Sequence, residues 1–543
     1  MKFARKIFLY AILGIVAGLA GFLFIVLVNT VIDLLITDSL PEEHHFGWLF
    51  LGVIAAFFIT RRCLSQGIIE LSQHVFWSIR KEMVEAIIKA PYLTVRALKE
   101  EIYSALTTDV NNITNASLVV IRVLSSIILV IACFVYLGYL SLPLFLLSIA
   151  CIGMGIAVYL RSASISHAQF AAVRELEQGF MKGFNDLLEG NKEIKINPGK
   201  GRDLLSSILL PIIAEGKKRN VRAYIGYLNS QLISQLLFYC LIAVILVAVG
   251  KHLVIELGTI VSFVFALLYL LGPIVNIMLN IPVLNRALIS YKKLNGIKEQ
   301  LQVSGKESEE DKLELLGREN AFEAMAFQGY EYSYPDGSFS IGPIHLSVKA
   351  NEIIFIYGGN GSGKTTFVNA ILSLYMPQKG SLLVNGQRIG EEQLTQTRAL
   401  FSPVFSDFHL FDGFYGIESI DAQRVRELLV LFEIDHKVSF KEGQLSTTDL
   451  STGQRKRLAL IAAILEDRPI LVLDEWAADQ DPYFRRKFYA EIIHRIVKEE
   501  NKTIIAITHD DLYYQEADRL FKMNYGQLEE ITTDARQVNQ PTP

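Results

Sequence analysis

The stretch that decides the fold of the C-terminal half is IIFIYGGNGSGKTTF, residues 353–367. The apolar run Ile353–Tyr357 predicts a buried strand, and the glycine-rich run after it predicts a loop that leads into a helix. In this strand–loop–helix context the pattern GxxxxGK[ST] is typical of a phosphate-binding loop, because backbone amides and a helix N-terminus surround phosphate oxygens. The predicted binding residues are Gly358, Gly359, Asn360, Gly361, Ser362, Gly363, Lys364, Thr365 and Thr366.

The individual side chains of this loop have distinct expected roles. Lys364 is expected to reach the β- and γ-phosphates of a nucleotide, and Thr365 to offer a hydroxyl to Mg²⁺. The alternative is a chance glycine-rich turn, which the spacing and the context disfavour.

A second apolar run ends in two carboxylates. Residues 469–475 read PILVLDE, and a strand buried on both faces has this continuous apolar character. Acids at the carboxyl end of such a strand lie where ligands bind in open α/β sheets. We expect Asp474 to hold Mg²⁺, and Glu475 to orient and deprotonate an attacking water as the general base.

Between these two motifs, residues 450–457 read LSTGQRKR and open a helix. Here the chain resembles the ATP-binding-cassette (ABC) transporter family, whose signature is LSGGQ. The resemblance implies that Ser451, Thr452, Gly453 and Gln454 contact the γ-phosphate of ATP held by the P-loop of a second copy, which makes the protein a homodimer. Thr452 replaces the usual glycine.

The family resemblance implies three further ATP-site residues. His509, which ends the run IIAITH, resembles the switch histidine that contacts the γ-phosphate, and Asp481 resembles the aspartate of the D-loop. Tyr334 resembles the aromatic residue that stacks on adenine, with Tyr332 as the alternative.

One position departs from the family pattern. The family usually carries a glutamine about 40 residues after the P-loop, which links Mg²⁺ to the membrane domain. The matching stretch here is PVFSDFHLF, and Ser406 occupies the glutamine position. Ser406 is too short to copy the reach of glutamine without a water, and Asp407 is the alternative substitute.

The N-terminal half has a membrane-spanning composition. Hydrophobic residues make up 51% of the 543 residues and charged residues only 20%, and a spanning helix needs about 20 mostly apolar residues. The predicted spans are Ile7–Ile32, Phe46–Thr60 with a helix continuing past Arg61 and Arg62, Leu118–Leu137, Leu142–Leu160, Tyr227–Gly250, and Ile255–Met278 interrupted by Gly272-Pro273.

Charges predict the topology of these spans. The loop 33–45 is acidic and has no Lys or Arg, whereas the long segments 61–99 and 161–222 are rich in both. By the positive-inside rule, the N-terminus, both long segments and the nucleotide-binding domain are cytoplasmic. The expected location is the bacterial inner membrane.

The two long segments predict helices that continue below the bilayer. Their mixed apolar and charged pattern has helical spacing, and we expect tips near Asn111 and Asn197 that dock onto the cytoplasmic domain. Long solvated helices without docking are the alternative. Within the spans, Arg122 is expected to snorkel to the interface, and Gln235 is expected to be a hydrogen-bond partner between helices, with cavity lining as the alternative.

The resulting prediction is a multidomain chain. An all-α transmembrane six-helix bundle over residues 1–299 is followed by a linker at 300–320 and an α/β P-loop nucleotide-binding domain over 321–543. The segment FSDFHLF, the serine in place of glutamine and the length of 543 residues resemble the bacterial exporters of cyclic peptides and siderophore precursors. This resemblance implies an ATP- and Mg²⁺-dependent exporter of a peptide-like or siderophore-like solute. A flippase for lipids or lipid-linked oligosaccharides and a multidrug exporter are the alternatives. The net charge of −4 gives no sign of a nucleic-acid partner.

Overall fold

The chain forms two compact units, each with its own hydrophobic core. The computed structural model describes residues 2–36, 44–249, 256–303, 322–390, 393, 397–417, 419–441 and 443–531. The first unit comprises Met1–Met83 and Glu100–Gly296, and the second comprises Val84–Lys99 together with the residues from Ile297 onward. The C-terminal end of one long helix, from Val84 onward, and the turn after it therefore belong to the second unit.

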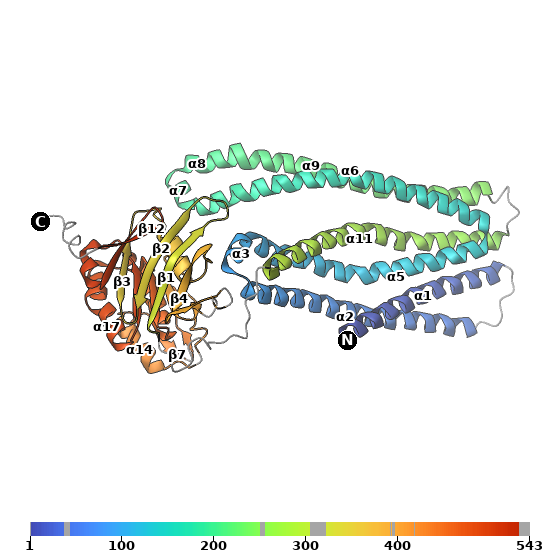
Figure 1. The fold of residues 1–543 in the computed structure, drawn as a ribbon. Coiled ribbons are helices and arrows are strands. Elements are labelled where there is room, and N and C mark those ends of the chain that lie inside the picture. Colours follow the sequence, from blue (N-terminus) through green and yellow to red (C-terminus); the bar gives the residue numbers. More distant parts are fainter. Residues whose placement is uncertain are drawn as a thin grey trace. The chain divides into compact units, whose positions relative to one another are not determined.

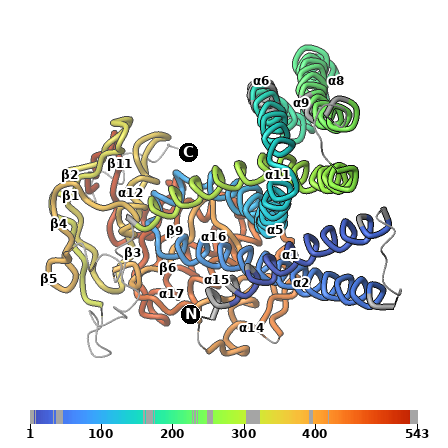
Figure 2. Tube along the Cα trace, turned by 90° about the vertical axis from the view of Figure 1, so that its right-hand side faces the viewer, coloured from blue at the N-terminus to red at the C-terminus, as the bar shows by residue number. Residues whose placement is uncertain are grey.

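Long helices build the first unit (Figure 1). In the described ranges they are α1 (Lys2–Ile36), α2 (His44–Lys89), α5 (Val110–Leu140), α6 (Leu142–Glu189), α9 (Leu210–Val244) and α11 (Leu257–Val303). Short elements join them: α3 (Tyr92–Ala97), α4 (Lys99–Ser104), α7 (Asn191–Ile196), α8 (Pro198–Asp203), and the π-helical turns η1 (Ala105–Asp109), η2 (Leu204–Leu209) and η3 (Ile245–Val249). Figure 2 agrees with Figure 1 in placing α6 beside α9.

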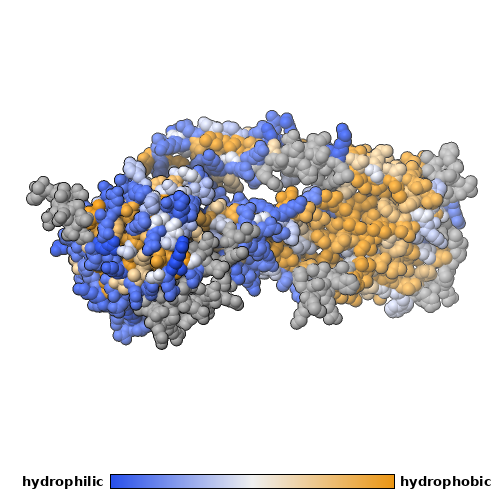
Figure 3. Space-filling model, in the orientation of Figure 1, coloured by the Kyte–Doolittle hydropathy of each residue, from blue (hydrophilic) through white to orange (hydrophobic). Residues whose placement is uncertain are grey.

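The apolar parts of these helices match the predicted spans. Four of the described helices are long and apolar enough to cross a membrane, and α6 and α9 each add a shorter apolar stretch, Leu142–Val158 and Gln235–Val247. Hydrophobic residues gather on one end of the helical unit, and its other end is largely hydrophilic (Figure 3). A continuous apolar surface of this kind suits a lipid environment.

One of the two predicted tips was placed wrongly. Asn111 lies inside α5, and the chain instead reverses at Ala90–Leu98, around α3. Pro91 explains the position, because a proline disfavours helical geometry in the residue before it and has no backbone N–H to donate. Asn197 does lie at a turn, between α7 and α8, where its side chain accepts a hydrogen bond from the Gly199 amide.

The last long helix is not interrupted. α11 continues through Gly272-Pro273 and also through Pro282. A proline inside a helix removes one backbone hydrogen bond but is tolerated in helices that pack against neighbours in membranes. The start of the predicted sixth span, Ile255, and most of the predicted linker 300–320 lie outside the described residues.

The second unit contains two main sheets. The first is antiparallel with strand order β2-β1-β4-β5, and the second has the order β12-β11-β3-β10-β9-β6. All pairs of the second sheet are parallel except β11–β12. The strands are β1 (Ala324–Ser333), β2 (Ser340–Lys349), β3 (Ile353–Tyr357), β4 (Lys379–Val384), β5 (Gln387–Arg388), β6 (Phe401–Val404), β9 (Ile470–Asp474), β10 (Thr503–Ile507), β11 (Arg519–Asn524) and β12 (Gln527–Ile531), and β7 (Phe440–Lys441) and β8 (Gln444–Leu445) form a hairpin.

Helices cover both faces of the parallel sheet. One face, with Ile354, Ile356 and Val472, packs against the antiparallel sheet and α12 (Lys364–Ile371). The other face, with Phe355 and Leu473, packs against a second set of helices. These helices are α14 (Ala422–Leu431), α15 (Thr452–Leu465), α16 (Pro482–Lys487) and α17 (Ile493–Glu499). Burial on both faces accounts for the continuous apolar runs in the sequence of β3, β9 and β10.

Candidate nucleotide-binding site

Four neighbouring parallel strands bring the predicted residues to one edge of the sheet. β3, β10, β9 and β6 are adjacent in that order, so their carboxyl ends meet at the same edge. Lys364 follows β3, His509 follows β10, and Glu475 follows β9. Ligands of open α/β sheets bind outside this edge.

The P-loop is folded tightly after β3. A Cβ on Gly358 would lie 2.3 Å from the carbonyl oxygen of Met523, so this position has room only for glycine. Gly363, the N-cap of α12, has a φ of 105°, which an L side chain rarely adopts. The loop positions Gly359, Asn360 and Gly361 are exposed, as is Thr365, whereas Ser362 and Thr366 are buried.

Lys364 closes the loop on itself. Its ammonium donates to the carbonyl oxygens of Gly358 (2.9 Å) and Gly359 (3.1 Å), although the residue is only 7% exposed. The ammonium also lies 3.8 Å from a carboxylate oxygen of Glu475. A buried cation that faces exposed glycines is suited to receive phosphate oxygens in place of these contacts.

Glu475 has a strained backbone conformation, which sets the direction of its side chain. Its φ of 49° and ψ of 36° lie in the left-handed region, which costs a non-glycine residue of order 1 kcal/mol or more. Its amide donates to the carbonyl oxygen of Ile507 on β10, and its carboxylate lies 3.1 Å from Nε2 of His509. Lys364, Glu475 and His509 therefore form one cluster, as the sequence predicted.

Asp474 and Ser406 form a second pair at this edge. Asp474 is 3% exposed, and burial raises the pKa of its carboxyl above the usual range. The Ser406 hydroxyl donates to Oδ2 of Asp474 at 3.0 Å, so Ser406, and not a long side chain, contacts this acid. A buried carboxylate with a single hydroxyl donor fits a cation ligand, because a metal ion offsets the cost of burying the charge.

The tyrosine pair predicted for adenine divides into a buried and an accessible member. Tyr332 is 5% exposed and stacks on Tyr375, with ring centroids 4.6 Å apart. Tyr334 is half-buried, and its hydroxyl lies 3.3 Å from the Thr366 hydroxyl and 3.4 Å from that of Tyr375. The position of Tyr334 beside α12 favours it over Tyr332 for contact with a base.

The helix α3 docks on the same tyrosines. Arg96 donates to the Tyr375 hydroxyl at 3.3 Å, and Tyr92 lies 6.5 Å from the Tyr375 ring. Leu93 packs against the core between the two sheets. The docking turn is therefore the one around α3 and not the tip predicted near Asn111, and Tyr375 connects this turn to Tyr334.

The signature residues form a separate part of the site. Ser451 caps α15 in a capping box with Gln454, and both open onto a pocket that also contains Asp481. Gly453 lets the start of α15 approach the backbone at Asp479 closely, since a Cβ on residue 453 would lie 2.7 Å from the Asp479 carbonyl oxygen. Thr452 is exposed at the first turn of the helix, so its extra side chain meets no obstacle.

Two supporting residues were missed by sequence reasoning. Lys456, 3% exposed, donates to the Glu475 carbonyl oxygen at 2.8 Å and pairs with Asp479 at 2.8 Å. Arg457 bonds Asp481 and Gln480, both at 2.8 Å. The run RKR after the signature was the available signal, but a basic run usually indicates a solvated helix face.

Comparisons with known proteins agree with this geometry. Residues 341–478 match the family described as ABC transporter. The chain is 31% identical over 525 residues to the ATP-binding protein SyrD of Pseudomonas syringae pv. syringae, which covers 94% of this chain and 92% of SyrD. It is 27% identical to an ATP-dependent lipid A-core flippase of Methylobacillus flagellatus, over 72% of this chain and 67% of the flippase.

A solved structure shares the fold along nearly the whole chain. The structure of a bacterial Atm1-family ABC exporter with ATP bound superposes with a TM-score of 0.78 at 16% identity and covers 99% of this chain and 96% of that one. The chain is thus a multi-pass membrane protein with an ABC exporter fold and an ATP-hydrolysing domain that powers transport. The extent of the match to SyrD and the match of residues 341–478 show that the chain belongs to the ABC transporter family.

Proposed function

We propose that this ATP-driven exporter works as a homodimer in the bacterial inner membrane and moves a peptide-like or siderophore-like solute out of the cytoplasm. Similarity to SyrD over 94% of the chain supports a solute of this class. The basic segments 61–99 and 161–222 support a cytoplasmic N-terminus and nucleotide-binding domain.

The observation that carries the proposal is the cluster of Lys364, Glu475 and His509. Lys364 binds the β- and γ-phosphates and neutralises the charge that develops on them. Glu475 orients the attacking water and takes its proton, and His509 holds the Glu475 carboxylate and contacts the γ-phosphate. Mg²⁺, held by Thr365 and Asp474, would supply further charge stabilisation when bound.

The signature loop supports a site shared by two copies. Ser451, Gln454 and Asp481 line a pocket that includes none of the P-loop residues among its lining. An exposed hydroxyl at a helix N-terminus is suited to an anion. We therefore place the γ-phosphate held by Lys364 of one copy against Ser451 of the other, which gives two equivalent sites.

The test is ATP hydrolysis by the purified protein in lipid, with Glu475→Gln beside the wild type. We expect the variant to lose at least about 100-fold in kcat while it still binds ATP, because general-base catalysis contributes this much. Glu491→Gln, on an exposed part of the same domain, is the matched control and should hydrolyse normally. Normal hydrolysis by Glu475→Gln would refute the assignment of the base.

A flippase is the second candidate. The similarity to lipid A-core flippases favours it, and a multidrug exporter shares the same architecture. Adding cyclic peptides, siderophore precursors or lipids to the hydrolysis assay separates these functions. Stimulation by peptides supports the proposal, whereas stimulation by lipids alone supports the flippase.

A further inference from the structure

The helical unit contains a large cavity whose mostly apolar lining includes several polar and charged side chains. It measures about 780 Å³, within the range of about 300–1,000 Å³ typical of small-molecule sites. Residues of α1, α2, α5 and α11 line it, including Arg61, Ser65, Arg122, Ser126, Tyr269 and Asn276. These six side chains are charged or carry a polar group, whereas the rest of the lining is largely apolar, as are the helices over much of their length.

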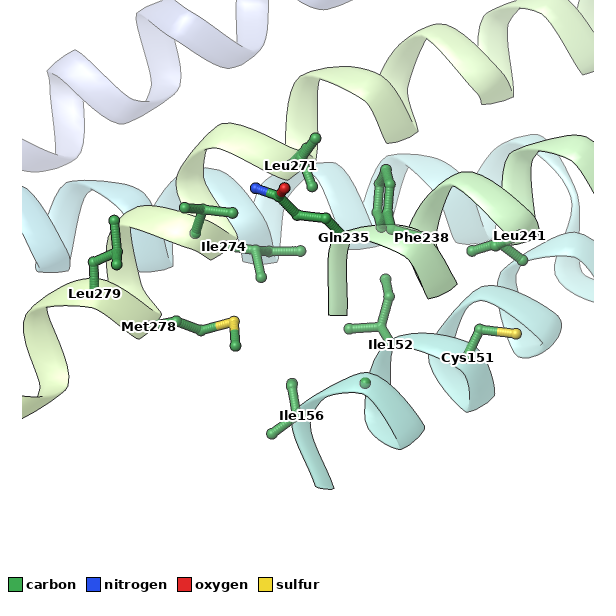
Figure 4. Close-up of a pocket in the computed structure, with 12 residues that line it drawn as sticks. Cys151, Ile152, Ile156, Gln235, Phe238, Leu241, Leu271, Ile274, Met278 and Leu279 are labelled. Carbon is green, nitrogen blue, oxygen red and sulfur yellow. The ribbon is translucent and has the colours of Figure 1, made fainter. Parts of the chain in front are cut away.

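The helix α11 separates this cavity from a second, apolar pocket. Tyr269, Gly272, Pro273 and Asn276 face the polar cavity, in the spacing of one helix face. The opposite face of α11 supplies Leu271, Ile274, Val275 and Met278 to the other pocket. Figure 4 shows that pocket, where the amide of Gln235 is surrounded by Ile152, Phe238, Leu271 and other apolar side chains. Polar groups are thus concentrated on the first side of α11.

Two arginines give the polar cavity its charge. The guanidinium of Arg61 lies 5.3 Å from the ring centroid of Phe57, and Nε of Arg122 donates to the Leu118 carbonyl oxygen at 3.2 Å. Over the described parts of the chain, neither arginine forms an ion pair with a carboxylate. Charged side chains within spanning helices are costly and mark functional sites when they face a cavity.

Three further polar residues of the lining are hydrogen-bonded to groups other than the two guanidinium groups. Asn276 donates to the Ser126 hydroxyl at 2.8 Å, and the Ser125 hydroxyl donates to the Ile121 carbonyl oxygen. The first contact connects α11 to α5, and the second lies within α5. Guanidinium groups recognise carboxylates and phosphates through paired N–H donors, which these serines and the asparagine cannot replace.

We propose that this cavity binds the transported solute through an anionic group held by Arg61 and Arg122, so that the substrates are amphipathic anions. The inference rests on the proposed function as an exporter, and it names the chemistry that the cavity selects. Asn276 and Ser126 contact the polar body of the solute, and Phe57 and Tyr269 contact its apolar part. A carboxylate on an acylated peptide and a phosphate on a lipid share this chemistry.

The test measures binding without nucleotide, on the full-length protein in phosphatidylcholine nanodiscs. The probe is a dansyl-labelled N-lauroyl tetrapeptide with two aspartates, compared with the same peptide with two asparagines, by fluorescence anisotropy. We expect the aspartate peptide to bind about tenfold more tightly at low salt, with the difference reduced at high salt. Equal binding of the two peptides would overturn the proposal.

Substitutions locate the effect. Arg61→Gln and Arg122→Gln should each weaken the aspartate peptide about tenfold and leave the asparagine peptide unchanged. Arg62→Gln is the matched control, because Arg62 is exposed beside Arg61 but does not line the cavity. Unchanged binding in both cavity variants, or an equal loss in Arg62→Gln, would contradict the assignment.

Two further measurements identify the source of the anion and test the proposed function independently of the binding site. Displacement of the labelled aspartate peptide by dilauroyl phosphatidic acid, but not by dilauroyl phosphatidylcholine, would show that a lipid phosphate also occupies the site. Displacement by the unlabelled aspartate peptide alone, and by neither lipid, would show a site for carboxylates. Basal ATP hydrolysis is measured in parallel. Absent hydrolysis in wild type with intact, arginine-dependent binding would refute the proposed function and leave this inference standing.

Discussion

At the scale of single residues, the contact of Ser406 with Asp474 leads to the most specific prediction. The Ser406 hydroxyl is the donor to the buried carboxylate of Asp474, at the position where the family usually carries glutamine. The short serine side chain donates a hydrogen bond directly to the Asp474 carboxylate. It is too short to reach groups beyond this carboxylate. Hydrogen bonds of this kind to a metal-binding carboxylate typically tune metal affinity.

Ser406→Ala should therefore raise the Mg²⁺ concentration needed for half-maximal ATP hydrolysis by about tenfold, the lower end of the usual effect of such supporting residues. The measurement is a Mg²⁺ titration at saturating ATP. Asp407→Asn, at the neighbouring exposed position, is the control and should leave the titration unchanged. A shift in Asp407→Asn with none in Ser406→Ala would show that Asp407 takes the glutamine role instead.

The grouping of the candidate ATP-site residues at one sheet edge could be predicted, because local motifs encode them. Lys364, Glu475 and His509 each follow a buried strand, and parallel strands bring such residues to one edge. The contacts of Lys456 and Arg457 were not predictable, since only the packed fold shows that these basic side chains are buried. The same limit applies to Tyr375, an aromatic residue with no motif around it.

At the scale of elements, α3 contacts Tyr375, which lies beside Tyr334 of the candidate nucleotide site. Tyr375 is fully buried, and burial raises the pKa of its phenol, so the hydroxyl stays protonated and can donate or accept. It accepts from Arg96 on α3 and lies within hydrogen-bonding distance of Tyr334. A movement of the Tyr334 side chain on nucleotide binding would therefore be transmitted to α3 through the contacts of Tyr375 with Tyr334 and Arg96.

Tyr375→Phe should weaken this path without removing the stacked ring. Each lost hydrogen bond is worth of order 1 kcal/mol, so ATP binding should fall by less than about tenfold. Amide hydrogen exchange over Tyr92–Ala97, with and without ATP in the Glu475→Gln background, measures the coupling. We expect ATP to protect these amides in the parent and much less in the variant, while Tyr483→Phe, an exposed control, behaves as the parent. Equal protection in all three proteins would exclude Tyr375 from the path.

The elements were predictable where hydrophobicity is periodic or continuous, and less so at their ends. The spans and the buried strands followed from long apolar runs. The first tip was predicted near Asn111, whereas α2 already ends at Lys89, two residues before Pro91. Gly272-Pro273 suggested an interruption, but packing against neighbouring helices keeps α11 continuous.

At the scale of the whole molecule, the central claim is that each ATP site is shared by two copies. The pocket lined by the signature-loop residues includes none of Lys364, Glu475 and His509 in its lining. A claim of this kind can be tested by distributing two defects between the halves of a fused dimer. Lys364→Met removes the cation proposed to bind phosphate, and Ser451→Asp keeps a good helix cap while it would repel the γ-phosphate under the proposed arrangement.

The most direct measurement is the amount of ATP retained by fused dimers whose two halves both carry Glu475→Gln. One fusion carries Lys364→Met in one half and Ser451→Asp in the other, and its counterpart carries both in the same half. If sites are shared between copies, the first fusion keeps one intact site and retains about half the ATP of the parent fusion, and the second retains almost none. The reverse result, with ATP retained only when both defects lie in the same half, would show that each chain forms its own site and would contradict the account.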